Sequence, residues 1–147
     1  MSIDVETRVT IRRPRGEVAA FMFDPANDML WTKAVVACRQ LTEGSLRAGS
    51  RVERTVVFLG RRFAYVYEVL EADPLRYLEL SVAKPFPMRV RYQLDDAEDG
   101  NTIATIHTWG DATGFFRIAG PLMAPMVRRN IARDLEVLKR HLEDCRE

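Results

Sequence analysis

The chain has few cysteines and lysines and no long apolar run. Its 147 residues include 2 cysteines, Cys38 and Cys145, which lie far apart and match no CxxC spacing. This argues against a disulfide scaffold or a zinc site, so we expect a reducing, cytoplasmic setting. No segment approaches the roughly 20 apolar residues that span a bilayer. The first residues also lack the basic and apolar regions of a secretory signal.

Motifs for catalysis and cofactor binding are missing as well. The sequence contains no GxSxG, no GxGxxG or GxxxxGK[ST], no HxxxH and no cysteine spaced for a metal. We therefore expect no metal and no cofactor. The absence of an acid–base pair favours a non-catalytic protein without deciding the question.

Charge of one sign is not in excess either. There are 22 basic and 21 acidic residues, a net charge of +1, and all but three of the basic residues are arginine. Such a balance argues against a nucleic-acid partner, which needs a basic face. With 47% hydrophobic and 29% charged residues, the composition is that of a globular protein, and we expect one domain over residues 1–147.

Alternation of apolar and polar residues with a period of two is the dominant pattern. It begins at Ile3–Ile11 and returns over six later segments, roughly 34–42, 50–59, 62–72, 76–84, 87–95 and 102–111. Gly, Pro and Asp-Gly breakers separate these segments, and Leu59-Gly60-Arg61 is typical of a tight turn. The pattern predicts seven strands, most of them in consecutive antiparallel hairpins.

Helical spacing appears in two places. Between the first two strands, residues 17–23 and a segment from Asp24-Pro25 to about Leu30-Trp31 predict two short helices, with Asp24 as N-cap. Past Gly114, apolar residues recur every three or four positions, which predicts one helix of about 30 residues. Two prolines in its first half predict a kink or an irregular start. The apolar stripe comprises Phe116, Ala119, Met123, Val127, Ile131, Leu135, Leu138 and Leu142.

The order of elements is β-α-α-β-β-β-β-β-β-α, an α+β fold. A sheet of seven strands has a large apolar face, and only one long helix is available to cover it. The sheet must therefore curve around the C-terminal helix.

This order resembles the helix-grip fold of the START-like, or SRPBCC, superfamily, over nearly the whole chain. The resemblance is carried by Pro14, Asp24-Pro25, Trp31, Gly49, Gly60, Glu68-Val69, Asp73-Pro74 and the segment Leu135, Leu138-Lys139, Leu142-Glu143. Within the superfamily, the chain is most similar to the bacterial polyketide cyclase/dehydrase and lipid-transport group. The resemblance implies a cavity between sheet and helix that binds a small apolar or amphipathic ligand.

Aromatic and methionine side chains share strand faces and helix positions that can meet inside such a fold. A packed core and a ligand pocket both explain them, and the polar tips of the tyrosines favour the pocket. The candidate ligand-binding residues are Trp31, Arg54, Phe58, Phe63, Tyr65, Tyr67, Met88, Tyr92, Trp109, Phe116, Met123, Met126 and Val127.

Two of the candidates carry open alternatives. Arg54 shares a face with Val52 and Val56, so it either points inward and binds a ligand anion or lies at the rim beside Glu53 or Glu68. His107 lies on segment 102–111, and either face of that segment is plausible as the inner one. Both residues are weak catalytic candidates.

Three functions from different classes remain open at this point. The first is binding, transport or sensing of a hydrophobic ligand, which fits the fold. The second is a cyclase or dehydratase acting on a polyketide-like substrate. The third is a protein-interaction module of a stress or toxin–antitoxin system. The sequence does not identify the ligand, and both a monomer and a homodimer are compatible with it.

Overall fold

The computed structural model describes residues 3–111, 113–116 and 120–144. Seven strands form one antiparallel sheet in the order β1-β7-β6-β5-β4-β3-β2. The strands are β1 (Ile3–Ile11), β2 (Val35–Gln40), β3 (Arg51–Phe58), β4 (Arg61–Asp73), β5 (Tyr77–Val82), β6 (Met88–Asp96) and β7 (Thr102–Gly110). Each overlaps a segment in which the alternation predicts a strand, so the predicted sheet is confirmed.

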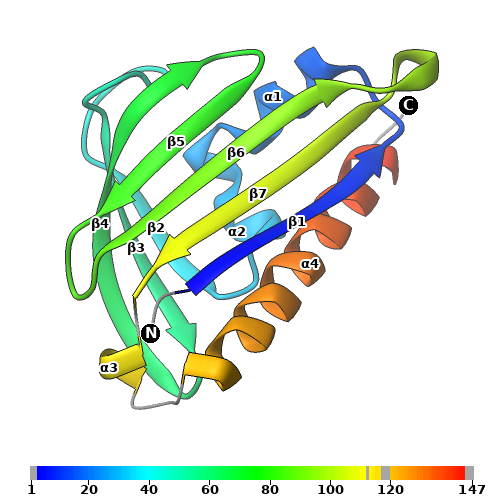
Figure 1. Ribbon diagram of the computed structural model, residues 1–147. Helices are drawn as coiled ribbons and strands as arrows, with labels where there is room; N and C mark the ends of the chain where they lie inside the picture. The colour runs from blue at the N-terminus through cyan, green and yellow to red at the C-terminus, as the bar shows by residue number, and fades with distance from the viewer. Residues whose placement is uncertain (1–2, 112, 117–119, 145–147) are drawn as a thin grey trace.

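The helices lie on one side of this sheet (Figure 1). They are α1 (Arg15–Met22), η1 (Pro25–Asn27), α2 (Asp28–Trp31), α3 (Thr113–Phe116) and α4 (Gly120–Asp144), with a further turn η2 (Glu98–Gly100) between β6 and β7. The long helix α4 runs beside β1 and packs against it. The predicted helix-grip architecture, a curved sheet closed around one long C-terminal helix, is confirmed.

The region before α4 differs from the prediction. The apolar spacing predicts one helix of about 30 residues, whereas α4 has 25 residues and begins at Gly120. Phe116 belongs to the separate short helix α3. Pro125 lies inside α4, and the helix continues past it. Ala119, like Cys145, lies outside the described residues.

The inner face of β7 is settled by its register. Thr102, Ala104, Ile106 and Thr108 are buried, and the alternate residues are only partly so. Val5 of β1 pairs with Thr108, and its side chain is fully buried in the core. The outer face therefore carries His107 and Trp109.

The β3–β4 hairpin turns at Leu59 and Gly60, as predicted. Their φ angles are 51° and 78°, and positive φ at both central residues is characteristic of a type I′ turn. Glycine adopts this backbone without strain, whereas leucine does so only where the hairpin demands it. The turn brings the ends of both strands close to α3, where Arg61 Nη1 donates to Phe115 O (2.5 Å).

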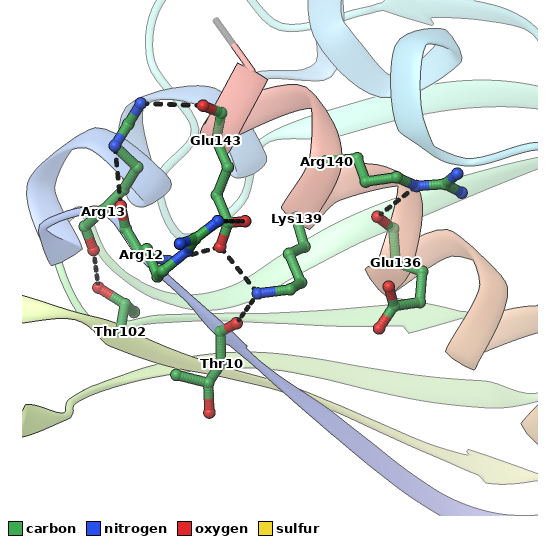
Figure 2. Close-up of polar contacts among 8 residues, drawn as sticks. All are labelled: Thr10, Arg12, Arg13, Thr102, Glu136, Lys139, Arg140 and Glu143. Atoms are coloured by element: carbon green, nitrogen blue, oxygen red, sulfur yellow. Dashed lines mark hydrogen bonds and ion pairs between the residues drawn. The ribbon is translucent and has the colours of Figure 1, made fainter. Parts of the chain in front are cut away.

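The far end of α4 is fastened to β1 by a polar cluster, here called the β1–α4 clamp (Figure 2). Glu143 accepts three hydrogen bonds: from the Arg12 backbone N–H (2.8 Å), the Arg12 guanidinium (3.2 Å) and Lys139 Nζ (2.8 Å). Lys139 also donates to Thr10 O (2.8 Å), and Arg13 donates to Glu143 O (3.1 Å). The clamp fixes the end of the helix over the end of the first strand.

The Glu143 carboxylate titrates below its ordinary range. Burial opposes its ionisation, but the hydrogen bonds from Lys139 and Arg12 outweigh this and lower its pKa to about 2. A carboxyl group whose pKa is depressed in the folded state stabilises the fold above its unfolded pKa. That contribution is lost as the pH falls through the folded pKa.

We expect Glu143→Gln to lower the free energy of unfolding at pH 7 by about 1 kcal/mol, since one acceptor oxygen and the charge are removed from the clamp. The deficit should shrink as the pH falls from about 4.5 towards about 2, which urea unfolding at several pH values measures. Glu136→Gln is the matched control, because Glu136 is exposed on the same helix and only its backbone oxygen is engaged, by Arg140. An equal loss in both variants would contradict the role of the clamp.

Candidate functional site

A cavity of about 190 Å³ lies between the sheet and the start of α4. Its walls are almost entirely apolar, and we call it the outer chamber. It is lined by Ile3, Ala34, Val56, Phe58, Phe63, Tyr65, Val82, Phe86, Met88, Val90, Thr108, Phe116, Met123, Val127, Asn130 and Ile131. The single helix α4 is too narrow to fill the whole curve of the sheet, which leaves this space.

Phenylalanine side chains cluster at the α3 end of the outer chamber. Phe116 packs edge-on against Phe58 (ring centroids 5.5 Å apart) and contacts Phe86 (5.8 Å). Phe63 packs against Phe115 (4.9 Å), whose ring in turn lies under the Arg61 guanidinium (3.8 Å). These rings come from the β3–β4 hairpin, from the connection between β5 and β6, and from α3. Together they form an aromatic wall around the α3 end of the outer chamber.

A second, more polar space of about 140 Å³ adjoins the first on the side of α2. This inner chamber shares Ala34, Val56, Tyr65, Val90, Thr108, Asn130 and Ile131 with the outer one. Its remaining lining residues are Trp31, Thr32, Val35, Arg54, Tyr92, Ile106 and Asp134. The interior therefore changes along its length from an apolar end to an end with ionisable groups.

The inner chamber is organised around a buried ion pair. Arg54 is 7% exposed and Asp28 only 2%. Arg54 Nε donates a hydrogen bond to Asp28 Oδ2 (2.9 Å), and Arg54 Nη2 lies 2.8 Å from the same oxygen. Burial opposes the charge on Arg54, but Asp28 raises the pKa of the guanidinium, which stays protonated. Arg54 thus points inward, and its partner is Asp28 rather than Glu53 or Glu68.

Tyrosine side chains surround the guanidinium. Arg54 Nη1 donates to the Tyr65 hydroxyl (3.3 Å), and Nη2 donates to the Tyr92 hydroxyl (3.3 Å). The guanidinium also lies over the Tyr67 ring, 4.8 Å from its centroid. Burial raises the pKa of Tyr92 to about 12 and that of Tyr67 further. These phenols are therefore neutral hydrogen-bonding groups at neutral pH.

Cys38 completes the surroundings of the ion pair. Its thiol is 3.5 Å from Asp28 Oδ2, to which it donates. Burial and the negative charge of Asp28 raise its pKa to about 11. The thiol therefore remains protonated and is a poor nucleophile.

Asp134 is the other carboxyl group of the inner chamber. It lies on α4, is 7% exposed, and accepts a hydrogen bond from the Lys33 backbone N–H (3.1 Å). Burial raises its pKa to about 6, against the opposing effects of that hydrogen bond and of nearby Arg133 and Arg54. Among the described residues, none forms an ion pair with it.

The Trp31 side chain has a buried hydrogen-bond donor without a partner. Its indole is 1% exposed, packs edge-on against Tyr92 (5.8 Å) and lines the inner chamber. Its Nε1–H is buried and has no hydrogen-bond partner within the described part of the chain. A buried donor without a partner is uncommon and calls for an explanation.

Most of the residues proposed from the sequence line one chamber or the other. The outer chamber contains Phe58, Phe63, Met88, Phe116, Met123 and Val127, the inner one contains Trp31, Arg54 and Tyr92, and Tyr65 lines both. Tyr67 is buried beneath Arg54 without lining either space.

Two proposed ligand-binding residues, Met126 and Trp109, line neither chamber, and the open question of which way His107 points is also answered. Met126 is 38% exposed on the outer side of α4, because it falls off the apolar stripe. Trp109 and His107 lie on the outer face of β7, where their rings stack at 4.4 Å and His107 Nε2 is 2.7 Å from Asp4 Oδ1. His107 therefore cannot reach a ligand in either chamber.

Two carboxylates, Asp134 in the lining of the inner chamber and Asp28 beside Arg54, are not among the residues proposed from the sequence. Asp134 had a signal: it falls three residues after Ile131 and four before Leu138, on the apolar stripe of the helix. Asp28 had no such signal. Its apolar neighbours Met29 and Leu30 would be expected to be buried instead of it, yet they are 55% and 53% exposed.

Metal-binding clusters and membrane-spanning helices are both absent from the described residues. Across residues 3–111, 113–116 and 120–144, no three His, Cys, Asp or Glu side chains are placed to hold a metal ion. Within the same ranges, no helix has the combination of length and hydropathy that crossing a bilayer requires.

The chain belongs to the polyketide cyclase/dehydrase and lipid transport family, whose model matches residues 2–143. This confirms the resemblance to the polyketide cyclase/dehydrase and lipid-transport group. A search of curated proteins finds no significant match.

Solved structures of the same fold cover almost the whole chain. The protein TTHA0849 from Thermus thermophilus superposes with a TM-score of 0.79 at 15% identity, covering 98% of this chain and 99% of that one. The Zhui aromatase/cyclase from Streptomyces sp. R1128 gives 0.78 at 19% identity, covering 97% and 94%. A START superfamily protein from Mycobacterium smegmatis gives 0.69 at 15% identity, covering 96% and 94%. At these identities the similarity establishes the fold alone.

We expect Arg54→Met to lower the free energy of unfolding by about 3–5 kcal/mol, because it leaves the Asp28 carboxylate buried without its counter-charge. The double variant Arg54→Met/Asp28→Asn should recover most of that loss, since both charges are then gone. Guanidinium unfolding measures all three proteins, and Arg51→Met, an exposed arginine on the same strand, is the control. No recovery in the double variant would mean that Arg54 stabilises the fold by other contacts.

Asp134→Asn should have the opposite effect on stability. The folded-state pKa of about 6 lies above the ordinary value of 3.8. The folded state therefore holds its proton more tightly, and stability falls as the pH rises through this window. We expect the variant to be more stable than the parent at pH 7.5 by about 1–2 kcal/mol, with the advantage vanishing towards pH 4. Thermal unfolding across this range tests it, with exposed Asp144→Asn as control; a less stable variant at pH 7.5 would contradict it.

Proposed function

We propose that this protein binds a small amphipathic molecule inside the fold, with its apolar part in the outer chamber and its polar end in the inner chamber. The observation that supports the proposal is a pair of adjoining chambers with a shared wall, one almost entirely apolar and the other lined by Arg54, Tyr65, Tyr92 and Asp134. Ligand sites are commonly apolar clefts with a few placed polar groups.

The size of the interior restricts the ligand. Its two parts measure about 190 and 140 Å³, and together they lie at the lower end of the roughly 300–1,000 Å³ of sites for drug-sized molecules. The ligand is therefore small, on the scale of one or two fused rings or a short acyl chain. The paired and hydrogen-bonded groups of the inner chamber are fixed by the protein, so they select one end of the ligand over the other.

A second candidate function is cyclisation or dehydration of such a ligand. It is favoured by Asp134, because a carboxyl group with a pKa of about 6 can exchange a proton near neutral pH. The hydroxyl groups of Tyr65 and Tyr92 and the fixed charge of Arg54 would orient a carbonyl beside it. Product formed from a β-keto compound by the parent protein, and not by Asp134→Asn, would favour this activity over simple binding.

Binding is tested by filling the interior. Val56 is buried on β3 and lines both chambers, while the adjacent Val57 is exposed on the other face. We expect the parent protein to take up the neutral fluorescent probe 1-naphthylamine, which has two fused rings. Val56→Phe should weaken uptake at least about tenfold, because the larger side chain fills space where the two chambers meet. The control Val57→Phe should bind the probe as the parent protein does.

Uptake is measured by the rise in probe emission and by native mass spectrometry. Circular dichroism shows whether both variants keep the fold. No uptake by the parent protein, or equal uptake by Val56→Phe, would overturn the binding proposal.

A further inference from the structure

The inner chamber has more carboxylate charge in and beside its walls than it has positive charge to balance it. Among the described residues, Arg54 is the one positively charged residue in its lining. The guanidinium is bound to Asp28, which lies 2.9 Å from Nε and 2.8 Å from Nη2. The buried positive charge is therefore balanced by Asp28 before the carboxyl group of Asp134 is counted.

The carboxyl group of Asp134 borders the chamber without a counter-charge. The residue is 7% exposed and lines this space. Its Oδ1 accepts a hydrogen bond from the Lys33 backbone N–H (3.1 Å), which is a neutral donor, and no described residue bonds to Oδ2. The buried side-chain atoms that are sealed off without a partner in the described part of the chain are Thr7 Oγ1 and Trp31 Nε1. Oδ2 is not one of them, so it still borders open space.

The positive charges around Asp134 do not form ion pairs with it. Burial raises its pKa to about 6, although the Lys33 backbone hydrogen bond and the charges of Arg133, Arg54 and Lys33 all act to lower it. The side chains of Arg133 and Lys33 are exposed and solvated, while Arg54 is bound to Asp28. Their combined effect is smaller than that of burial.

The other polar groups near the ion pair add no positive charge. Burial raises the pKa of the Cys38 thiol to about 11 and that of Tyr92 to about 12, so both are neutral at neutral pH. The hydroxyl groups of Tyr65 and Tyr92 accept hydrogen bonds from Arg54. Ionisation of Asp134 therefore leaves the chamber with an unbalanced negative charge.

This imbalance distinguishes the polar groups that a ligand could bring. A second anion would be repelled strongly in a space of low dielectric constant. A neutral group would leave the carboxylate without a counter-charge, which is costly. A cation removes that deficit, and because folding has already desolvated the carboxylate, only the ligand's own desolvation opposes binding.

We propose that the inner chamber binds the protonated amino group of an amphipathic ligand, with the ammonium group paired to the Asp134 carboxylate. This assignment rests on the proposed binding function and specifies its ligand class. A primary ammonium group has three N–H donors and no acceptor, which suits a carboxylate oxygen that has no donor of its own. Further acceptor oxygens in the lining are the hydroxyls of Thr32, Tyr65, Tyr92 and Thr108.

The test is a set of ligands that share one skeleton and differ in charge. The probes are 2-naphthylmethylamine, 2-naphthylmethanol and 2-naphthoate, titrated into the whole protein by calorimetry at about pH 7.5, where Asp134 is ionised and the amine is protonated. We expect the amine to bind at least about tenfold more tightly than the alcohol of the same shape, because it makes a hydrogen bond between two charged groups. The naphthoate should bind most weakly.

A variant assigns this preference to Asp134. Asp134→Asn keeps the shape of the side chain and removes its charge, so the amine should bind within about twofold of the alcohol, whose own affinity should change by less than about twofold. Glu136→Gln is the matched control, because it removes the same charge from an exposed position two residues along the helix. It should keep the full preference for the amine.

The pH dependence provides a second readout that a purely structural role of Asp134 would not affect. Because a bound ammonium group keeps Asp134 ionised, the affinity for the amine should fall about tenfold from pH 7.5 to pH 5, while that for the alcohol changes little. Calorimetry at about pH 6 in buffers of different ionisation enthalpy should show release of roughly half a proton per amine bound, and none in Asp134→Asn.

The outcomes separate this inference from the function on which it rests. If the parent protein binds none of the three probes, the amine assignment fails, and uptake of 1-naphthylamine decides whether the binding function fails with it. If the alcohol or the naphthoate binds as tightly as the amine, the protein is a ligand binder and the amine assignment is wrong. If Asp134→Asn retains the preference, or if binding of the amine releases no proton, Asp134 does not hold the amino group and the assignment is again wrong.

Discussion

A buried guanidinium needs a carboxylate as its counter-charge, and in this protein the resulting ion pair links the helical layer to the sheet. Arg54 comes from the middle of β3 and Asp28 from the start of α2, and neither is accessible to solvent. Their attraction offsets the desolvation of both groups only because the geometry is close and the tyrosine hydroxyls accept hydrogen bonds from two further N–H groups of Arg54. The pair therefore dictates where α2 sits, and α2 in turn positions Trp31 over the interior.

The shape of the interior follows from a mismatch between the layers. Seven strands present a face wider than one helix can cover, and α4 packs mainly on β1 at one edge of the sheet. The short helices α1 and α2 cover part of the remainder (Figure 1). What is left uncovered beneath β3, β4 and β6 is the cavity, bounded by the phenylalanine side chains at the α3 end and by the ion pair at the α2 end. The cavity exists because the helices do not cover the whole sheet, and its α2 end is polar because the buried ion pair lies there.

Much of the fold could be predicted from the sequence, because strands that are buried on one face alternate strictly. The inner face of β7 was ambiguous since Thr102, Ala104, Ile106 and Thr108 are less apolar as a set than a core face usually is. Pairing with β1 determines which face of β7 is buried. A contact between strands about 100 residues apart cannot be inferred from the local sequence pattern. The partner of Arg54 was missed for the same reason, because nothing in the local pattern brings Asp28 to β3. Asp134 was visible as a carboxylate on an apolar stripe, and its chemistry depends on burial that only the assembled layers create.

The place of β1 in the sheet has a consequence for biosynthesis. This strand is synthesised before the other six, yet in the sheet it pairs with β7, and the first pair in their register is Ile3 with Gly110. At about 5–20 residues per second, roughly 5–20 s pass before that neighbour is made. Throughout this interval an alternating strand with Ile3, Val5 and Ile11 on one face has no edge to pair with, which is the condition under which nascent chains associate wrongly or recruit chaperones. The alternating charges on its other face, Asp4, Glu6 and Arg8, help keep the waiting strand in solution.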